Sequence, residues 1–354
     1  MNIRRPIPTA AAAGAAVLGL LALSACSDAG AADGKEGGKL SVVASFYPMQ
    51  YLAEQIGGEH VKVTTLTKPG VEPHDLELKP RQTAQLSEAG YVLYLKGVQP
   101  SVDGAIEKAG VKHTTDAAAL TDLDVAGIET TAGKSGGKSG GKSGGGNGAD
   151  DGHGHGHDEH AEGEGEDGGH SADDGHNHGE DGADPHVWLD PVKYAEIAEG
   201  VGAALGKADP DNAAAYEKNA DALVTKLKAL DASFRDGLKN TTTKTFITTH
   251  SAFGHLAGRY GLEQEGVAGV DPEAEPSLAR IKELQSVAKK DNVTTVFFET
   301  LASDRTAKTL AADTGLKTDV LDPLEGITDK SKGRDYFEVM NANLVALKTA
   351  LGAK

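Results

Sequence analysis

Ala183-Asp184-Pro185-His186-Val187-Trp188-Leu189-Asp190-Pro191 is the stretch around which the chain is organised. It follows a long tract of glycine, histidine and acidic residues, and it precedes a strongly helical segment. A single histidine beside the only tryptophan of a chain is more often a packed, hydrogen-bonded residue than a ligand. Histidines and an aspartate in similar settings elsewhere change that interpretation for His186.

The residues before the tract predict an α/β lobe. Short β-branched runs alternate with segments of helical spacing, which is typical of a parallel sheet covered by helices. The predicted strands are 40–46, 61–66, 91–95 and a short one near Val111, and the helices are 49–56, 81–89 and 101–109. The second strand runs into a loop that contains His74. In such sheets ligands bind at the carboxyl ends of the strands.

The residues after Pro191 predict two helices and a second α/β lobe. The helices are 192–205 and 211 or 212 to about 238, and the second is about 40 Å long, enough to bridge both lobes. The strands that follow are 245–249, an extended piece at 267–270, 294–299 and 317–321, with helices 252–260, 277–290, 305–314 and 336–351. We therefore predict an α/β fold of two parallel-sheet lobes. The N-terminal lobe is 40–190, the helical region 191–240 and the C-terminal lobe 241–354.

The N-terminus is typical of an exported protein. Arg4 and Arg5 precede an apolar run at 10–23 that ends in Leu23-Ser24-Ala25-Cys26. This stretch resembles a bacterial lipobox, which implies that 1–25 is a signal peptide and that Cys26 is acylated; the alternative is an ordinary secretory signal with a chance cysteine. Residues 26–39 are predicted to be a flexible tether. We expect an extracytoplasmic protein held by lipid to the outer face of the cell membrane.

The charge of the chain favours a cationic ligand. The formal net charge is −18, which disfavours binding to nucleic acid or to an anionic membrane surface. Much of this charge lies in residues 131–184, a glycine-rich segment that cannot bury enough apolar surface to fold and is predicted to be a disordered loop of the N-terminal lobe. Its histidines are His153, His155, His157, His160, His170, His176 and His178. They are predicted to bind metal weakly, to sense zinc, or to act only as a spacer.

Four residues at comparable places are the candidate metal ligands. They are His74, His186, His250 and Asp322, three of which lie where a predicted strand gives way to a loop or helix. Each alone has an ordinary structural explanation, and Asp322 before Pro323 is also a good turn former. Together they would supply three imidazole nitrogens and a carboxylate oxygen, a set suited to tetrahedral Zn²⁺. Glu299 is expected to be either an acceptor for a ligand imidazole or a structural carboxylate, and His255 to be structural.

These motifs together resemble the zinc/manganese-specific solute-binding proteins of bacterial ABC importers. The resemblance covers essentially the whole mature chain. It rests on Glu72-Pro73-His74-Asp75 with Pro80-Arg81, the stretch 184–191, Thr249-His250-Ser251-Ala252-Phe253-Gly254 with Tyr260-Gly261-Leu262, Pro272-Glu273-Ala274-Glu275-Pro276-Ser277, and Leu321-Asp322-Pro323-Leu324. It implies that the four candidate residues bind metal in a cleft between two lobes joined by one long rigid helix. Family members that handle zinc tend to have histidine at the position of His250, whereas manganese binders tend to have glutamate.

The predicted function is a high-affinity zinc receptor. The resemblance implies that it delivers Zn²⁺ to an ABC permease with a separate ATPase subunit, and we expect a monomer. The alternatives are a manganese receptor of the same fold, or a surface histidine-rich zinc buffer or adhesin. We expect no enzyme activity, because a fourth protein ligand would close the zinc shell and the sequence contains no H-E-x-x-H motif. Affinity is expected to fall as the pH drops through about 6.5, because only neutral imidazole binds metal.

Overall fold

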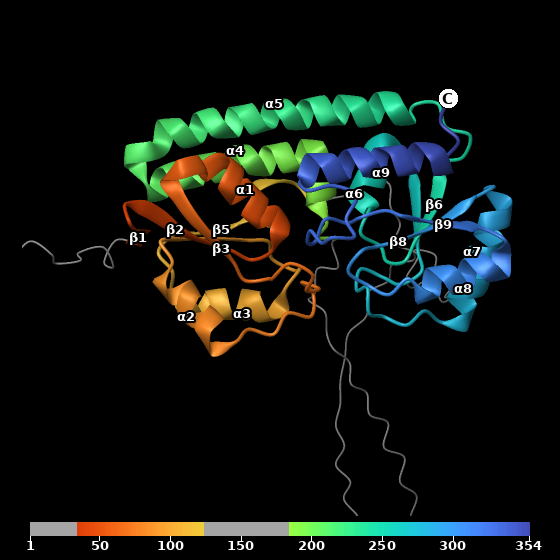
Figure 1. Ribbon diagram of the computed structural model, residues 1–354, viewed down its shortest axis with the longest axis horizontal. Helices are drawn as coiled ribbons and strands as arrows, with labels where there is room; N and C mark the ends of the chain where they lie inside the picture. The colour runs from red at the N-terminus through yellow and green to blue at the C-terminus, as the bar shows by residue number, and fades with distance from the viewer. Residues whose placement is uncertain (1–33, 124–183) are drawn as a thin grey trace, which may run out of the picture.

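Two α/β lobes lie side by side beneath one long helix that extends over both (Figure 1). The computed structural model describes residues 34–123 and 184–354, and each lobe is built on its own sheet. The predicted fold class is confirmed. The leader, Cys26 and the seven histidines of the tract lie outside the described residues.

The N-terminal lobe is a sheet with its longest strand at the centre. Strand β2 (Lys39–Ala44) pairs in parallel with β3 (Val61–Thr65) and β4 (Tyr91–Tyr94), and β4 pairs with β5 (Thr114–Asp116). Helices α1 (Tyr47–Gly57), α2 (Pro80–Glu88) and α3 (Pro100–Ala109) connect these strands. Strand β5 begins three residues later than the expected position at Val111, because Gly110 ends α3 in the left-handed conformation and the chain must first turn.

A short antiparallel strand precedes β2. Strand β1 (Lys35–Glu36) pairs with Leu40 and Lys39, and Lys35 forms an ion pair of 2.9 Å with the buried carboxylate of Asp209. Residues 35 and 36, which were expected to belong to the flexible tether over 26–39, are therefore paired in the sheet.

The C-terminal lobe is a four-stranded parallel sheet in the order β7-β6-β8-β9. Its strands are β6 (Thr245–Thr248), β7 (Glu263–Gly266), β8 (Thr295–Phe298) and β9 (Lys317–Val320), and its helices are α6 (Gly254–Tyr260), α7 (Leu278–Lys290), α8 (Arg305–Thr314) and α9 (Tyr336–Ala350). The extended piece expected at 267–270 is wrong by four residues. Helix α6 ends at Gly261 with a φ of 63°, so the polar sequence that follows enters the sheet at once as β7.

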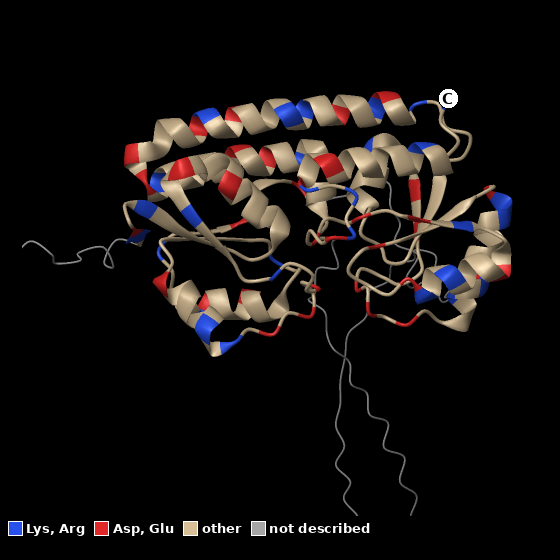
Figure 2. Cartoon of the chain, in the orientation of Figure 1, with Lys and Arg blue, Asp and Glu red and all other residues tan. Residues whose placement is uncertain are grey.

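Helices α4 and α5 join the lobes. Helix α4 (Pro191–Ala208) leads through a 3-10 turn (Pro210–Asn212) into α5 (Ala213–Leu238), whose 26 residues correspond to about 39 Å. Helix α5 packs on α1 and α4 at one end and on α6 and α9 at the other (Figure 1). Basic and acidic residues are mixed along its length (Figure 2), and all of them except Asp231 are exposed. Helix α5 is therefore amphipathic, and its buried face packs against both lobes.

One hydrophobic core continues from lobe to lobe. It includes Leu52 and Trp188 on the N-terminal side and Phe253 and Tyr336 on the C-terminal side. Phe253 is 2% exposed and the other three residues are 0% exposed. Smaller clusters lie under the remaining helices of each lobe. Because the main core crosses the boundary, it restricts the movement of one lobe relative to the other. Among residues 34–123 and 184–354, no helix combines the length and apolar character needed to cross a membrane.

Candidate metal centre

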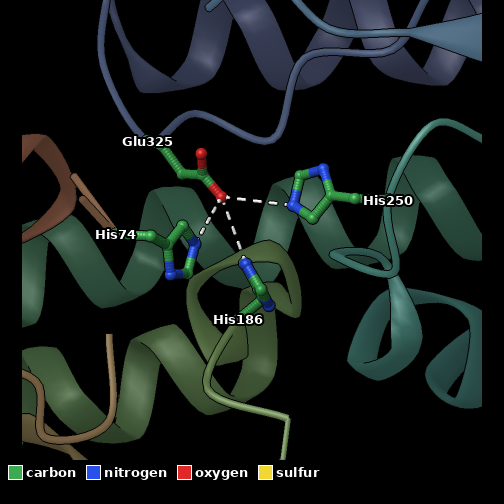
Figure 3. Close-up of side chains that lie close together, drawn as sticks. All are labelled: His74, His186, His250 and Glu325. Atoms are coloured by element: carbon green, nitrogen blue, oxygen red, sulfur yellow. Dashed lines mark hydrogen bonds and ion pairs between the residues drawn. The ribbon is translucent and has the colours of Figure 1, made fainter. Parts of the chain in front are cut away.

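Three histidine rings meet at one carboxylate between the lobes (Figure 3). His74 comes from the loop after β3, His186 precedes the 3-10 turn Val187–Leu189, His250 lies two residues after the end of β6, and Glu325 lies in the loop after β9. The Nε2 atoms of His74, His186 and His250 lie 3.3, 3.1 and 3.4 Å from Glu325 Oε1. Three of the four predicted residues are thus brought together, and two of them, His74 and His250, lie in the loops after parallel strands, as expected.

The centre is buried, with one side closer to solvent. The side chains of His186 and Glu325 are 0% exposed and that of His250 is 2% exposed, whereas His74 is 13% exposed. His74, in the loop after β3, is therefore the donor residue closest to solvent.

Carboxylates behind two of the rings fix their orientation. Asp184 Oδ1 lies 2.7 Å from His186 Nδ1, and Glu299 Oε1 lies 2.8 Å from His250 Nδ1. A carboxylate accepts the proton of Nδ1, so Nε2 of each ring is directed at Glu325 with its lone pair available to a cation. The contact expected of Glu299 is therefore present, and Asp184 makes the same contact to a second ring.

The protonation of the centre follows from these contacts. Burial lowers the pKa of both His186 and His250, but the carboxylates of Asp184, Glu299 and Glu325 outweigh it, and the pKa of His250 rises well above its ordinary value. Burial likewise opposes the charge on Glu325, yet hydrogen bonds from the histidines hold its pKa well below its usual range. Positive charge is therefore strongly favoured between the rings and Glu325, whether it is supplied by protons or by a metal ion.

A further carboxyl group lies at the edge of the centre. Glu72 accepts the backbone N–H of His74 through Oε1 at 3.2 Å, and its carboxylate lies close to those of Glu299 and Glu325. Burial, followed by the charge on Glu325, raises the pKa of Glu72 to about 9. Glu72 is thus held in its neutral form at pH 7 in the metal-free protein.

Asp322, the fourth predicted ligand, does not belong to this group. Its Oδ1 accepts the N–H of Leu324 at 2.9 Å, and its Oδ2 accepts the hydroxyl of Thr300 at 3.1 Å. Leu324 has a φ of 59°, so the chain reverses there and Glu325 is directed towards the histidines. The prediction therefore identified the correct loop but placed the wrong carboxylate in the centre. The sequence signal that could have found Glu325 is a second carboxylate within the same strand-end loop.

His255 has the structural role expected of it. Its Nε2 donates to the backbone carbonyl of Asp184 at 2.7 Å, and the residue is 1% exposed. This bond holds Asp184 in the position from which it contacts His186.

The spacing of the three Nε2 atoms from Glu325 Oε1 is compatible with a tetrahedral zinc ion, and all four donor atoms lie within 4.8 Å of one another. Zinc bonds of about 2.0–2.1 Å at tetrahedral angles separate neighbouring ligand atoms by about 3.3 Å. The three Nε2 to Oε1 distances of 3.1–3.4 Å bracket that value. In addition, the second carboxylate oxygen of Glu325, Oε2, is buried and has no hydrogen-bond partner among the described residues. The arrangement is therefore suited to bind a cation that prefers nitrogen and oxygen ligands.

Comparison with known proteins agrees with this fold. The chain belongs to the family described as zinc-uptake complex component A, periplasmic (ZnuA), whose model matches residues 42–350. It is a family of substrate-binding receptors. The resemblance inferred from the motifs is thereby confirmed.

Individual relatives match over most of the chain. The high-affinity zinc uptake system protein ZnuA of Bacillus subtilis is 37% identical over 340 residues, which cover 94% of this chain and 95% of that protein. The zinc-binding lipoprotein AdcA of Streptococcus pneumoniae is 34% identical over 334 residues, which cover 93% of this chain but only 58% of AdcA.

Solved structures show the same architecture. The Zn(II)-bound ZnuA-like domain of S. pneumoniae AdcA superposes with a TM-score of 0.63 at 31% identity, covering 89% of this chain and 99% of that domain. The laminin-binding protein Lmb of Streptococcus agalactiae, described as an adhesin with metal-transporting activity, gives a TM-score of 0.67 at 26% identity and covers 88% of this chain.

Proposed function

We propose that this protein is an extracytoplasmic receptor that binds Zn²⁺ through His74, His186, His250 and Glu325 and delivers it to an ABC importer. The observation that supports this most directly is the match between the 3.1–3.4 Å donor spacing and the ligand spacing of tetrahedral zinc. The zinc ion is the cargo, and a permease driven by a separate ATPase subunit is the partner.

Zinc is favoured over manganese by the donor set. Three of the four donors are imidazole nitrogens, which suit Zn²⁺, whereas Mn²⁺ prefers oxygen ligands. Four protein donors also leave no open position for an activated water, so the centre is suited to binding rather than to hydrolysis.

Metal specificity is tested by titrating the full chain with Zn²⁺ or Mn²⁺ against a chelator of known affinity. A second form should lack residues 131–183, because Asp184 must remain to contact His186. We expect one tight Zn²⁺ site in both forms and much weaker Mn²⁺ binding. We propose that the tract histidines add weak accessory sites, which should disappear in the shorter form. If tight binding vanished with the tract, the protein would be a histidine-rich buffer.

Delivery is tested in a strain that lacks the gene. The wild-type chain should restore growth in zinc-limited medium, and His250→Ala should not. His113→Ala is the matched control, because it removes a histidine outside the centre. A receptor that binds zinc tightly but does not restore growth would be a buffer or an adhesin, and the transport role would be wrong.

We further propose that the chain is a monomer anchored by a lipid at Cys26. The Cys26→Ser variant should move from the membrane fraction to the soluble extracytoplasmic fraction while it retains zinc binding. A variant that stays in the membrane fraction would contradict the anchor. Light scattering coupled to gel filtration should give the mass of a single chain, and a dimer would contradict the monomer.

A further inference from the structure

Trp188 connects the two sides of the metal centre. Its Nε1–H donates to the backbone carbonyl of Pro323 at 2.7 Å, and Pro323 lies two residues before Glu325. Its ring centroid lies 5.1 Å from that of His186 and 5.0 Å from that of Phe46. The residue is 0% exposed. One side chain thus contacts one candidate ligand directly and binds the loop that carries another.

The loop that carries Glu325 needs such a contact. Asp322 is held by its own lobe, because the Asn343 amide binds both its N–H at 2.9 Å and its carbonyl at 2.7 Å. Leu324 lies in the left-handed region, which is unfavourable for a residue with a branched side chain. The bond from Trp188 to Pro323 lies between these two points. It is therefore placed to fix the direction in which the chain leaves Asp322.

We propose that Trp188 is a positioning residue for metal binding, which sets the distance between Glu325 and His186 through its bond to Pro323. This inference rests on the proposed zinc site. Without the indole N–H, the buried carbonyl of Pro323 loses its donor, and the strained turn at Leu324 can relax. A shift of a few tenths of an ångström at Glu325 Oε1 would then spoil the donor spacing.

The competing explanation is that Trp188 is only a large core residue. A matched control separates the two explanations. Tyr336 donates its hydroxyl to the backbone carbonyl of Trp188 at 2.7 Å, so Tyr336→Phe removes a buried bond of equal length at the same residue. Unlike Trp188→Phe, it leaves the bond to Pro323 in place.

The test compares Zn²⁺ affinity with stability for both variants in the full chain. Affinity is measured by chelator competition at pH 7.5, and the Tm of the metal-free protein by circular dichroism. Both variants should lower Tm, but only Trp188→Phe should weaken binding, by about 10- to 100-fold as for other residues that orient metal ligands. Binding by Trp188→Phe within about threefold of wild type, or an equal loss in Tyr336→Phe, would overturn the proposal.

A measurement on the wild-type chain removes the dependence on a folded variant. Trp188 is the only tryptophan, so its indole N–H gives one resonance that reports this bond alone. We expect the signal to survive for hours in D2O and to shift when one equivalent of Zn²⁺ is added. Exchange within minutes, or an unmoved signal while zinc binds tightly, would refute the positioning role and leave the receptor function intact. Absence of tight zinc binding would instead refute the receptor function.

Discussion

Replacing Glu325 by glutamine should weaken zinc binding by about three orders of magnitude. The substitution keeps the shape of the side chain and removes one negative charge that lies 3.1–3.4 Å from three imidazole nitrogens. Two unit charges 4 Å apart interact by about 4 kcal/mol at an effective dielectric constant of about 20. The ion carries two charges, but Glu325 also stabilises the protonated histidines of the metal-free protein, so part of the effect cancels. A net loss of about 4 kcal/mol corresponds to about a 1000-fold rise in Kd.

The assay is competition for one equivalent of Zn²⁺ with a chromophoric chelator at pH 7.5. All variants are compared in the form that lacks residues 131–183, so that weak zinc binding by the tract histidines does not mask the loss at the centre. Asp322→Asn is the matched control, because asparagine can still accept the N–H of Leu324 and Asp322 lies outside the donor group. It should change Kd by less than about tenfold. The reasoning would be refuted if Glu325→Gln bound zinc within about tenfold of wild type, or if the two variants lost equal affinity.

Four further predictions concern the effect of pH, the contact of Glu299 with His250, and the ion pair between Arg259 and Asp190. Burial lowers the pKa of His186 and His250, but the nearby carboxylates raise it more, so protons compete with zinc for these rings above pH 6.5. Zn²⁺ affinity should therefore rise at least about 100-fold from pH 5.5 to 7.5, and a flat profile would contradict this. Because histidines with a raised pKa stabilise the fold at low pH and lose that effect as they deprotonate, the metal-free Tm should be lower at pH 8 than at pH 6, and an increase would be inconsistent with the assignment. Glu299→Gln should raise the zinc Kd by about 10- to 100-fold in the same titration, since it weakens the acceptor for His250 Nδ1; an unchanged Kd would show that this contact is only structural. Arg259→Ala should lower the free energy of unfolding by on the order of 3 kcal/mol in a urea titration, since the buried Asp190 carboxylate loses its partner at 2.8 Å. A loss below about 1 kcal/mol would show that this ion pair does not stabilise the fold.

Much of the fold follows from local pattern. Runs of apolar and β-branched residues predicted β2, β4, β6 and β8, which are largely buried, and the alternation of Val61-Lys62-Val63 predicted β3, which is only partly buried. Strand β7 was misplaced because its sequence, Glu-Gln-Glu-Gly, has no apolar alternation; it is an edge strand whose position is set by the end of α6. Its pairing with β6 is a tertiary effect that no local pattern contains.

Some residues of the candidate site could likewise be predicted from local sequence, and one could not. His74 and His250 were predictable because each follows a strand, and carboxyl ends of parallel strands converge on one edge. Glu325 was not, because its direction depends on the positive φ of Leu324, a conformation that the sequence Asp-Pro-Leu-Glu does not indicate. The same turn withdraws Asp322 from the centre.

The most direct test is a crystal structure of the protein loaded with one equivalent of Zn²⁺, with anomalous diffraction measured at the zinc edge. We predict a single strong anomalous peak about 2.0–2.2 Å from the Nε2 atoms of His74, His186 and His250 and from a carboxylate oxygen of Glu325. A peak bound instead by Asp322, or only by histidines of residues 131–183, would contradict the proposed centre.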